Sequence, residues 1–185
     1  MGEFILGGQR SGKSRCAESR AAAWLMQPGR SAVLIATALP GDDEMRERMA
    51  RHQADRAHRV PALLCVEEPR DLAMALRQQS AASRLIVVDC LTLWLTNLLV
   101  PMHGEPLDDD ALAAATAALI DALRHAPGPV VLVSNEIGLG VTPLGRPTRR
   151  FVDELGRLHQ LVAQACERVT LMVAGIEVPV KGPSL

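Results

Sequence analysis

The chain has 185 residues, of which 48% are hydrophobic and 22% charged, a composition that is typical of a soluble globular domain and excludes intrinsic disorder. Its formal net charge of −1 argues against a nucleic-acid polymer as partner, and no apolar run approaches the ~20 residues that a membrane span needs. The first strand-like residues begin at Phe4, which leaves no room for a signal peptide, and the four cysteines lack paired or zinc-binding spacing, so we expect reduced thiols in a cytoplasmic protein.

Strand-like and helical patterns alternate along the chain. Apolar runs of strand length predict strands at residues 3–6, 32–38, 62–67, 84–89, 129–136 and 168–176. Helical patterns, with acidic or proline residues at several first turns, predict helices at residues 14–26, 42–57, 69–79, 90–99, 108–126 and 148–166. Apolar strands separated by helices indicate a mostly parallel sheet with helices on both faces. Since no linker is long or polar enough to mark a boundary, residues 1–185 are predicted to form a single α/β domain.

The segment GGQRSGKS carries the complete phosphate-loop pattern G-x-x-x-x-G-K-[ST], between a predicted strand and a predicted helix. Glycines let backbone N–H groups converge on phosphate oxygens, and the helix N-terminus adds partial positive charge. Lys13 is expected to reach the β- and γ-phosphates, and Ser14 to bind Mg²⁺. The alternative is a plain glycine turn before a helix. The predicted nucleotide-binding residues of this loop are Gly7, Gly8, Gln9, Arg10, Ser11, Gly12, Lys13 and Ser14.

Two carboxylates at the ends of strand-like runs are candidates to complete the site. Asp89 ends the run 84–89, and a phosphate loop that binds Mg²⁺ usually has a carboxylate at the end of a neighbouring strand. The alternative role for Asp89 is to cap the following helix. Glu136 ends the run 129–136, at the ligand-binding edge of such a sheet; its alternative role is a structural hydrogen bond to the adjacent loop. Asp89 is thus predicted as a catalytic residue and Mg²⁺ ligand.

The segment MRERMARHQADR, residues 45–56, contains a histidine within a helix of alternating charge. At 100° per residue, Met45, Met49 and His52 fall on one stripe of about 80°. Arg56 lies on the same stripe. The methionines mark this stripe as the face toward the protein body, so His52 could bind phosphate, or attack it when neutral. On the residues alone, a satisfied interior histidine is the favoured interpretation.

The motifs of the chain occur in a specific order, GGQRSGKSRCAE, LIATALPGDDEMRERMARHQADR, VVDCLTLWLTNLL, LVSNEIGLGVTP and VAGI. In these motifs, and over nearly its whole length, the chain resembles the bifunctional adenosylcobinamide kinase/adenosylcobinamide-phosphate guanylyltransferases of cobalamin biosynthesis. The resemblance implies a phosphate-loop domain of RecA-like type, a homotrimer and two reactions. Family members phosphorylate the aminopropanol hydroxyl of adenosylcobinamide with ATP or GTP. They then transfer GMP from GTP to the new phosphate through a GMP–histidine intermediate and release pyrophosphate.

The resemblance also implies roles for individual residues. The family segment DDEMxxRIxxH places the nucleophile at His52, and the second histidine of some members is replaced here by Arg51. Guanine-nucleotide contacts are implied at Ala36, Thr37, Ala38, Gln53, Ala54, Asp55, Arg56, Glu67 and Asp89. The chain departs from the family pattern at Gln53, where arginine is frequent, and at His159, where asparagine is usual. It also has LLCVE in place of W-x-T-x-E, which weakens the assignment of Glu67.

Two other functional classes fit the phosphate loop without the later motifs. One is a different small-molecule kinase or NTPase with no histidine chemistry. The other is a nucleotide-binding regulatory module that hydrolyses little. A covalent label on His52 distinguishes the guanylyltransferase from both, because only that reaction attacks the α-phosphorus with a side chain.

Overall fold

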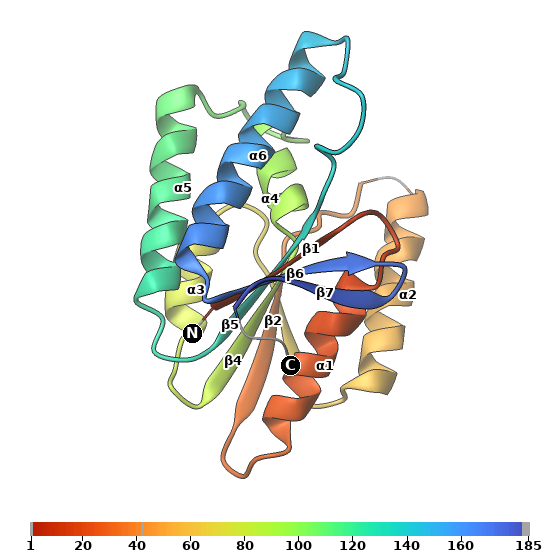
Figure 1. Ribbon diagram of the computed structural model, residues 1–185, viewed down its shortest axis with the longest axis vertical. Coiled ribbons are helices and arrows are strands. Elements are labelled where there is room, and N and C mark those ends of the chain that lie inside the picture. The colour runs from red at the N-terminus through yellow and green to blue at the C-terminus, as the bar shows by residue number, and fades with distance from the viewer. Residues whose placement is uncertain (1, 42, 183–185) are drawn as a thin grey trace.

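The computed structural model of the protein describes residues 2–41 and 43–182, without the side chains of Glu44, Met45, Arg48 and His52. The strands of this part of the chain are β1 (Gly2–Gly7), β2 (Ser31–Ala36), β3 (Leu63–Glu67), β4 (Arg84–Asp89), β5 (Val130–Asn135), β6 (Arg168–Val173) and β7 (Ile176–Lys181). Its helices are α1 (Lys13–Leu25), α2 (Asp43–Arg59), α3 (Leu72–Gln79), α4 (Leu91–Leu99), α5 (Asp109–Arg124) and α6 (Arg146–Ala165). Strands and helices alternate along the chain, except that α5 follows α4 and β7 follows β6 (Figure 1).

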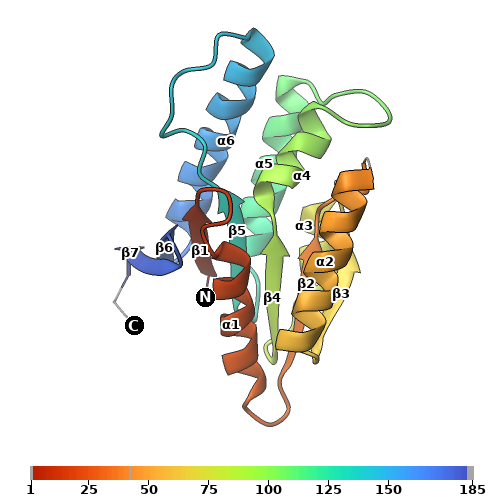
Figure 2. The same cartoon turned by 90° about the vertical axis from the view of Figure 1, so that its right-hand side faces the viewer.

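All seven strands belong to one sheet, in the order β3-β2-β4-β5-β1-β6-β7. Neighbouring strands pair in parallel except β7, which runs antiparallel to β6. Helices α1 and α2 cover one face, seen in Figure 2, while α3, α4, α5 and α6 cover the other. The predicted fold class, a mostly parallel α/β sheet with helices on both faces, is confirmed. That residues 1–185 form a single domain stays a prediction.

The central strands are apolar throughout because each contributes side chains to two separate cores. Phe4 of β1 packs into the core under α3 to α6, whereas its neighbour Ile5 packs into the core under α1. Ile86 and Val87 of β4 divide between the two cores in the same way. Successive side chains of a strand point to opposite faces, so a sheet covered on both sides needs apolar residues at every position.

Helix α3 begins three residues later than the predicted range 69–79. Asp71 is its N-cap and accepts a hydrogen bond from the Met74 N–H at 3.3 Å. The preceding residues are held in a turn, in which the Glu68 carboxylate accepts from the backbone N–H groups of Arg70 and Asp71 at 2.9 and 2.7 Å. The prediction of Pro69 in the first helical turn is therefore wrong, since the Asp71 cap and this turn start the helix after it.

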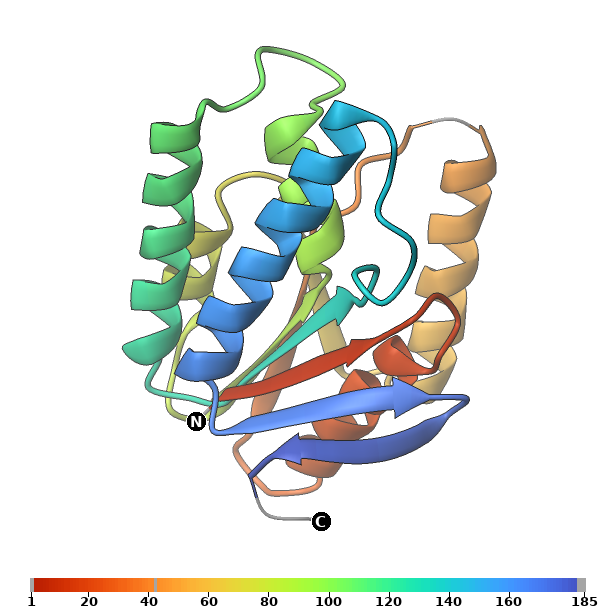
Figure 3. The ribbon, with the colours of Figure 1, turned by 45° about the horizontal axis from the view of Figure 1, so that its top comes forward.

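The last predicted strand, 168–176, is wrong at its end. Strand β6 stops at Val173, and a tight turn with positive φ at Ala174 and Gly175 reverses the chain into β7 (Figure 3). Strand β7 forms one edge of the sheet, and all of its residues are exposed. Strand β7 was not predicted, because Pro179 and the charged residues obscure its alternation. Proline is tolerated there because an edge strand has unpaired N–H positions.

Candidate functional site

Four of the predicted site residues lie at the carboxyl ends of parallel strands. Ala36 at the end of β2 pairs with Glu67 on one side and with Asp89 on the other. Strand β5 separates β4 from β1, and Gly7 at the end of β1 pairs with Asn135. Open α/β sheets bind ligands outside the carboxyl ends of their strands, and the structure brings the predicted residues to that edge.

The phosphate loop connects β1 directly to α1, as predicted. A Cβ atom at Gly7 would stand 2.6 Å from both the Met172 carbonyl oxygen and Ser11 Oγ, so no larger residue fits without a shift. Gly12 is the N-cap of α1 and adopts φ 101°, a conformation that strongly favours glycine. The residues Gly8, Gln9 and Arg10 between these positions are exposed. The glycines therefore shape an open loop in front of the helix N-terminus, where anions bind.

Two polar side chains of this loop are buried at its base. Lys13 is 7% exposed, and its Nζ donates to the Gly8 carbonyl oxygen at 2.6 Å. Ser11 is 8% exposed, and its Oγ has no hydrogen-bond partner among the described residues. A buried hydroxyl without a partner is costly, so the loop fits a ligand that supplies hydrogen-bonding oxygens. Phosphate is such a ligand.

The turn between β6 and β7 is hydrogen-bonded to the phosphate loop. The Gly175 N–H donates to the Ser11 carbonyl oxygen at 2.9 Å. In addition, Arg20 of α1 forms ion pairs with Glu3 of β1 at 3.0 Å and with Glu177 of β7 at 2.5 Å. The C-terminal hairpin is thus tied to both elements that flank the loop.

Thr37, a predicted nucleotide contact, uses its side chain for another purpose. Its hydroxyl donates to the Cys90 carbonyl oxygen at 2.7 Å and accepts from the Cys90 N–H at 2.9 Å, and the residue is fully buried. Its carbonyl oxygen accepts from Asn97 Nδ2 at 2.7 Å. The hydroxyl joins the ends of β2 and β4, so any nucleotide contact from residues 36–38 has to come from the half-buried Ala36 and Ala38 or the backbone.

The helical stripe that contains position 52 faces the protein at its other described positions. Met49 and Arg56 are half-buried, whereas every other described side chain of α2 is exposed, including the predicted contacts Gln53, Ala54 and Asp55. Arg56 Nη2 lies 3.8 Å from Cys65 Sγ of β3. The side chains of His52 and Met45 lie outside the described residues. By helical spacing, position 52 falls between Met49 and Arg56 on the half-buried face.

Glu136 lies beside the phosphate loop, and both interpretations of its role find support. Its backbone N–H donates to the Gly7 carbonyl oxygen at 3.0 Å. Its Oε1 accepts from the Gly138 N–H at 2.6 Å, which is the structural hydrogen bond to the adjacent loop. Its Oε2 lies 3.7 Å from Nδ1 of His159 of α6. His159 carried a signal in the sequence, since it stands where the family usually has asparagine.

The cysteines carry no reactive thiolate at the core of the molecule. All four are free thiols, and Cys16, Cys90 and Cys166 are buried. Burial raises the pKa of Cys16 and Cys166 to about 12 and that of Cys90 to about 11, so these thiols stay protonated at neutral pH. Partial burial also raises the pKa of Cys65, the exposed thiol, so none of the four cysteines is an activated nucleophile.

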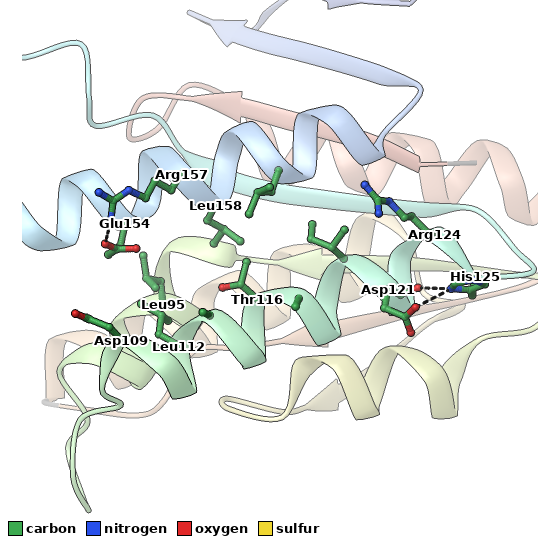
Figure 4. A pocket seen from close by; sticks show the side chains of 14 residues that line it. Leu95, Asp109, Leu112, Thr116, Asp121, Arg124, His125, Glu154, Arg157 and Leu158 are labelled. Atoms are coloured by element: carbon green, nitrogen blue, oxygen red, sulfur yellow. Dashed lines mark hydrogen bonds and ion pairs between the residues drawn. The ribbon is translucent and has the colours of Figure 1, made fainter.

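A hollow lies between α5 and α6, away from the phosphate loop (Figure 4). It has a volume of about 640 Å³ and a floor of apolar side chains, among them Leu95, Leu112 and Leu158. Paired charges stand at its two ends, Arg157 with Glu154 and His125 with Asp121. None of the predicted nucleotide-binding residues lines it, so it is a groove between helices and not the candidate active site.

No helix in the described residues is long and apolar enough to cross a membrane.

Comparison with known proteins gives one consistent result. The family model described as cobinamide kinase / cobinamide phosphate guanyltransferase matches residues 3–180. The bifunctional adenosylcobalamin biosynthesis protein CobP of Pseudomonas aeruginosa is 50% identical over 185 residues, 100% of both chains. The bifunctional adenosylcobalamin biosynthesis proteins CobU of Salmonella typhimurium and Escherichia coli are 36% and 34% identical, covering 96% of this chain and 98% of theirs. The resemblance inferred from the motifs is confirmed over the full chain.

Proposed function

The chain belongs to the cobinamide kinase/cobinamide phosphate guanyltransferase family, and we propose that it phosphorylates adenosylcobinamide at the phosphate loop and then transfers GMP to the product through His52. The observation that carries this proposal is the complete phosphate loop at the carboxyl edge of a parallel sheet, in a chain that matches the family from residue 3 to residue 180. The enzyme is a bifunctional transferase of adenosylcobalamin biosynthesis.

In the kinase step the phosphate loop holds ATP or GTP. Lys13 and the loop N–H groups stabilise charge on the γ-phosphoryl group while the hydroxyl of adenosylcobinamide attacks it. The Ser14 hydroxyl and the Asp89 carboxylate are oxygen donors of the kind that Mg²⁺ prefers, so these two residues would hold the ion. Bound there, Mg²⁺ would neutralise charge on the phosphate oxygens.

In the guanylyl step His52 attacks the α-phosphorus of GTP, and pyrophosphate leaves. The phosphate of the corrinoid then displaces the histidine and takes up GMP. An imidazole has to be neutral to attack, and an unperturbed pKa near 6.5 leaves much of it neutral at pH 7. The half-burial of Met49 and Arg56, on the same stripe of α2, supports the assignment of His52 as the nucleophile.

The two steps use different phosphorus atoms several Å apart, so we propose that α2 shifts between them. Only Met49 and Arg56 of its described side chains are even half-buried, which leaves little packing to hold the helix in one place. Gly41 precedes the helix and provides a flexible connection.

For the whole protein we propose a homotrimer in the cytoplasm, where its four thiols stay reduced.

The histidine intermediate is tested with GTP labelled at the α-phosphorus. The protein is incubated with labelled GTP and Mg²⁺, denatured, and examined for label on the chain. We expect label that is acid-labile and base-stable, as a phosphorus–nitrogen bond requires. His52→Ala should abolish it, and His58→Ala, an exposed histidine of the same helix, should retain it. A wild-type chain that stays unlabelled while phosphorylating adenosylcobinamide would show that the histidine mechanism is wrong.

A further inference from the structure

Glu136 stands at the centre of the carboxyl edge, directly after β5. In the sheet β5 lies between β1, which leads into the phosphate loop, and β4, which ends in Asp89. The bond from the Glu136 N–H to the Gly7 carbonyl oxygen fixes its backbone to the start of the loop. Its side chain is 22% exposed, so the carboxylate is open to the space in front of the edge.

One carboxylate oxygen of Glu136 is held by the protein, and the other faces a histidine. Oε1 accepts from the Gly138 N–H, whereas Oε2 lies 3.7 Å from His159 Nδ1, longer than a hydrogen bond but within the range of a direct electrostatic contact. His159 is 8% exposed, and its ring packs edge-on against Phe4 with a centroid distance of 5.4 Å. The histidine is therefore fixed in place below the carboxylate.

A buried chain of hydroxyls contacts the other ring nitrogen of His159. His159 Nε2 lies 2.8 Å from Ser134 Oγ, which lies 3.0 Å from Thr92 Oγ1. Thr92 Oγ1 also accepts from the Asn135 N–H at 2.8 Å. Ser134 is fully buried and Thr92 is 9% exposed, so water does not take part freely in these contacts.

The Glu136 carboxylate that faces His159 Nδ1 sets the direction of these contacts, because it favours an N–H at that nitrogen. Thr92 donates to Ser134, and Ser134 donates to His159 Nε2. The remaining proton of a neutral ring then sits on Nδ1 and faces Glu136. The opposite direction would turn the Nδ1 lone pair toward a carboxylate, which is unfavourable. Burial also lowers the pKa of His159, which keeps the ring neutral.

We propose that Glu136 is the proton acceptor of the kinase step and that His159 positions and polarises it. This inference rests on the proposed function. The hydroxyl oxygen of adenosylcobinamide bonds to the γ-phosphorus, the bond from that phosphorus to the β–γ bridging oxygen breaks, and the nucleoside diphosphate leaves. The hydroxyl proton passes to a carboxylate oxygen of Glu136. Because Asp89 is assigned to the metal, its carboxylate is less available as a base.

The guanylyl step gives Glu136 no proton to accept. A neutral imidazole attacks without losing a proton first, and the corrinoid phosphate that accepts GMP is already ionised. The two activities of the same enzyme therefore respond differently to a change at Glu136, which provides an internal control.

The first experiment replaces Glu136 with glutamine, which keeps the shape but cannot accept a proton. Kinase activity is measured with ATP and adenosylcobinamide, and guanylyl transfer is measured separately with GTP and adenosylcobinamide phosphate. We expect the kinase kcat to fall about 100-fold or more, as for loss of a general base, while guanylyl transfer changes less than about threefold. A Glu136→Gln enzyme with kinase activity within about threefold of wild type overturns the inference, as does an equal loss of both activities. A wild-type enzyme that phosphorylates no adenosylcobinamide contradicts the proposed function instead.

The second experiment tests His159 as a positioning residue with His159→Phe, which keeps an aromatic ring but has no N–H. Loss of the N–H facing Glu136 removes a contact that favours the ionised carboxylate, so the acidic limb of the kinase kcat–pH profile should move to higher pH. The other charged groups at this edge, Lys13 and Asp89, are unchanged in the variant. We expect a fall in kinase kcat of about tenfold and an unchanged guanylyl pH profile. A lower melting temperature with both pH profiles unmoved would assign His159 to packing alone and overturn its role.

Discussion

The hydroxyl of Ser11 is unusual at the residue scale because it is buried and lacks a partner among the described residues. In the proposed enzyme a nucleotide phosphate supplies that partner. Ser11→Ala should therefore raise the free energy of unfolding of the nucleotide-free protein by about 1 kcal/mol, or the melting temperature by about 2–4 °C. The same change should weaken nucleotide binding about tenfold, because a hydrogen bond to a charged phosphate is lost.

Calorimetric melting without nucleotide and titration with a non-hydrolysable GTP analogue measure these two effects separately. The two changes have opposite signs, so general damage to the loop would not produce them. If Ser11→Ala lowers the melting temperature and leaves the affinity unchanged, the hydroxyl has a structural partner and no role in binding.

Site residues could be predicted from the sequence where their chemistry is contained in a short segment. The eight residues from Gly7 to Ser14 form such a segment, and their strand–loop–helix context is as predicted. The role of the Thr37 hydroxyl could not be predicted from a short segment, since it bonds to Cys90, 53 positions further along the chain. The contacts of His159 with Ser134 and Glu136 likewise depend on how α6 packs on β5, which no local pattern encodes.

At the scale of elements, α2 is attached to α1 through one buried carboxylate. Arg59 Nε donates to Glu18 Oε2 at 2.6 Å, and Glu18 is only 5% exposed. Arg59→Met leaves that carboxylate buried without its partner, and we expect the free energy of unfolding to fall by about 2 kcal/mol. Chemical denaturation followed by circular dichroism measures this loss.

The ion pair between Arg46 and Asp43 on the same helix provides the matched control. Both of its side chains are more than half exposed, so Arg46→Met should cost no more than about 0.5 kcal/mol. The double change Arg59→Met with Glu18→Met should recover part of the loss, because it removes the unpaired charge. Equal losses of unfolding free energy from Arg59→Met and Arg46→Met would show that the Arg59–Glu18 ion pair does not hold α2 to α1.

Element types were easier to predict from the sequence than element ends. The continuous apolar run 84–89 corresponds to β4 without any shift, since a strand buried on both faces has no ambiguous positions. The start of α3 was misplaced because the Asp71 cap competes with proline as a start signal. Strand β7 was missed because Pro179 and two charged residues interrupt the alternation of Ile176, Val178 and Val180.

At the scale of the whole molecule, apolar side chains remain exposed on two separate segments. Ile176 and Val180 on the edge strand β7 are 68% and 64% exposed, and Leu139, Val141 and Leu144 before α6 are at least 85% exposed. Apolar surface of this kind favours association with another protein surface. The homotrimer proposed from the family resemblance would cover part of it.

We expect the purified protein to have a mass close to three times 19.9 kDa when measured by size-exclusion chromatography with light scattering. Closed cyclic symmetry limits the assembly to a discrete size, so the mass should not rise further as the protein concentration increases. An interface that buries apolar side chains should also persist at 1 M salt, where exposed ion pairs are screened within about 3 Å. A mass of 19.9 kDa at every concentration, or a mass that grows continuously, would contradict the trimer while leaving both catalytic proposals to be decided by their own assays.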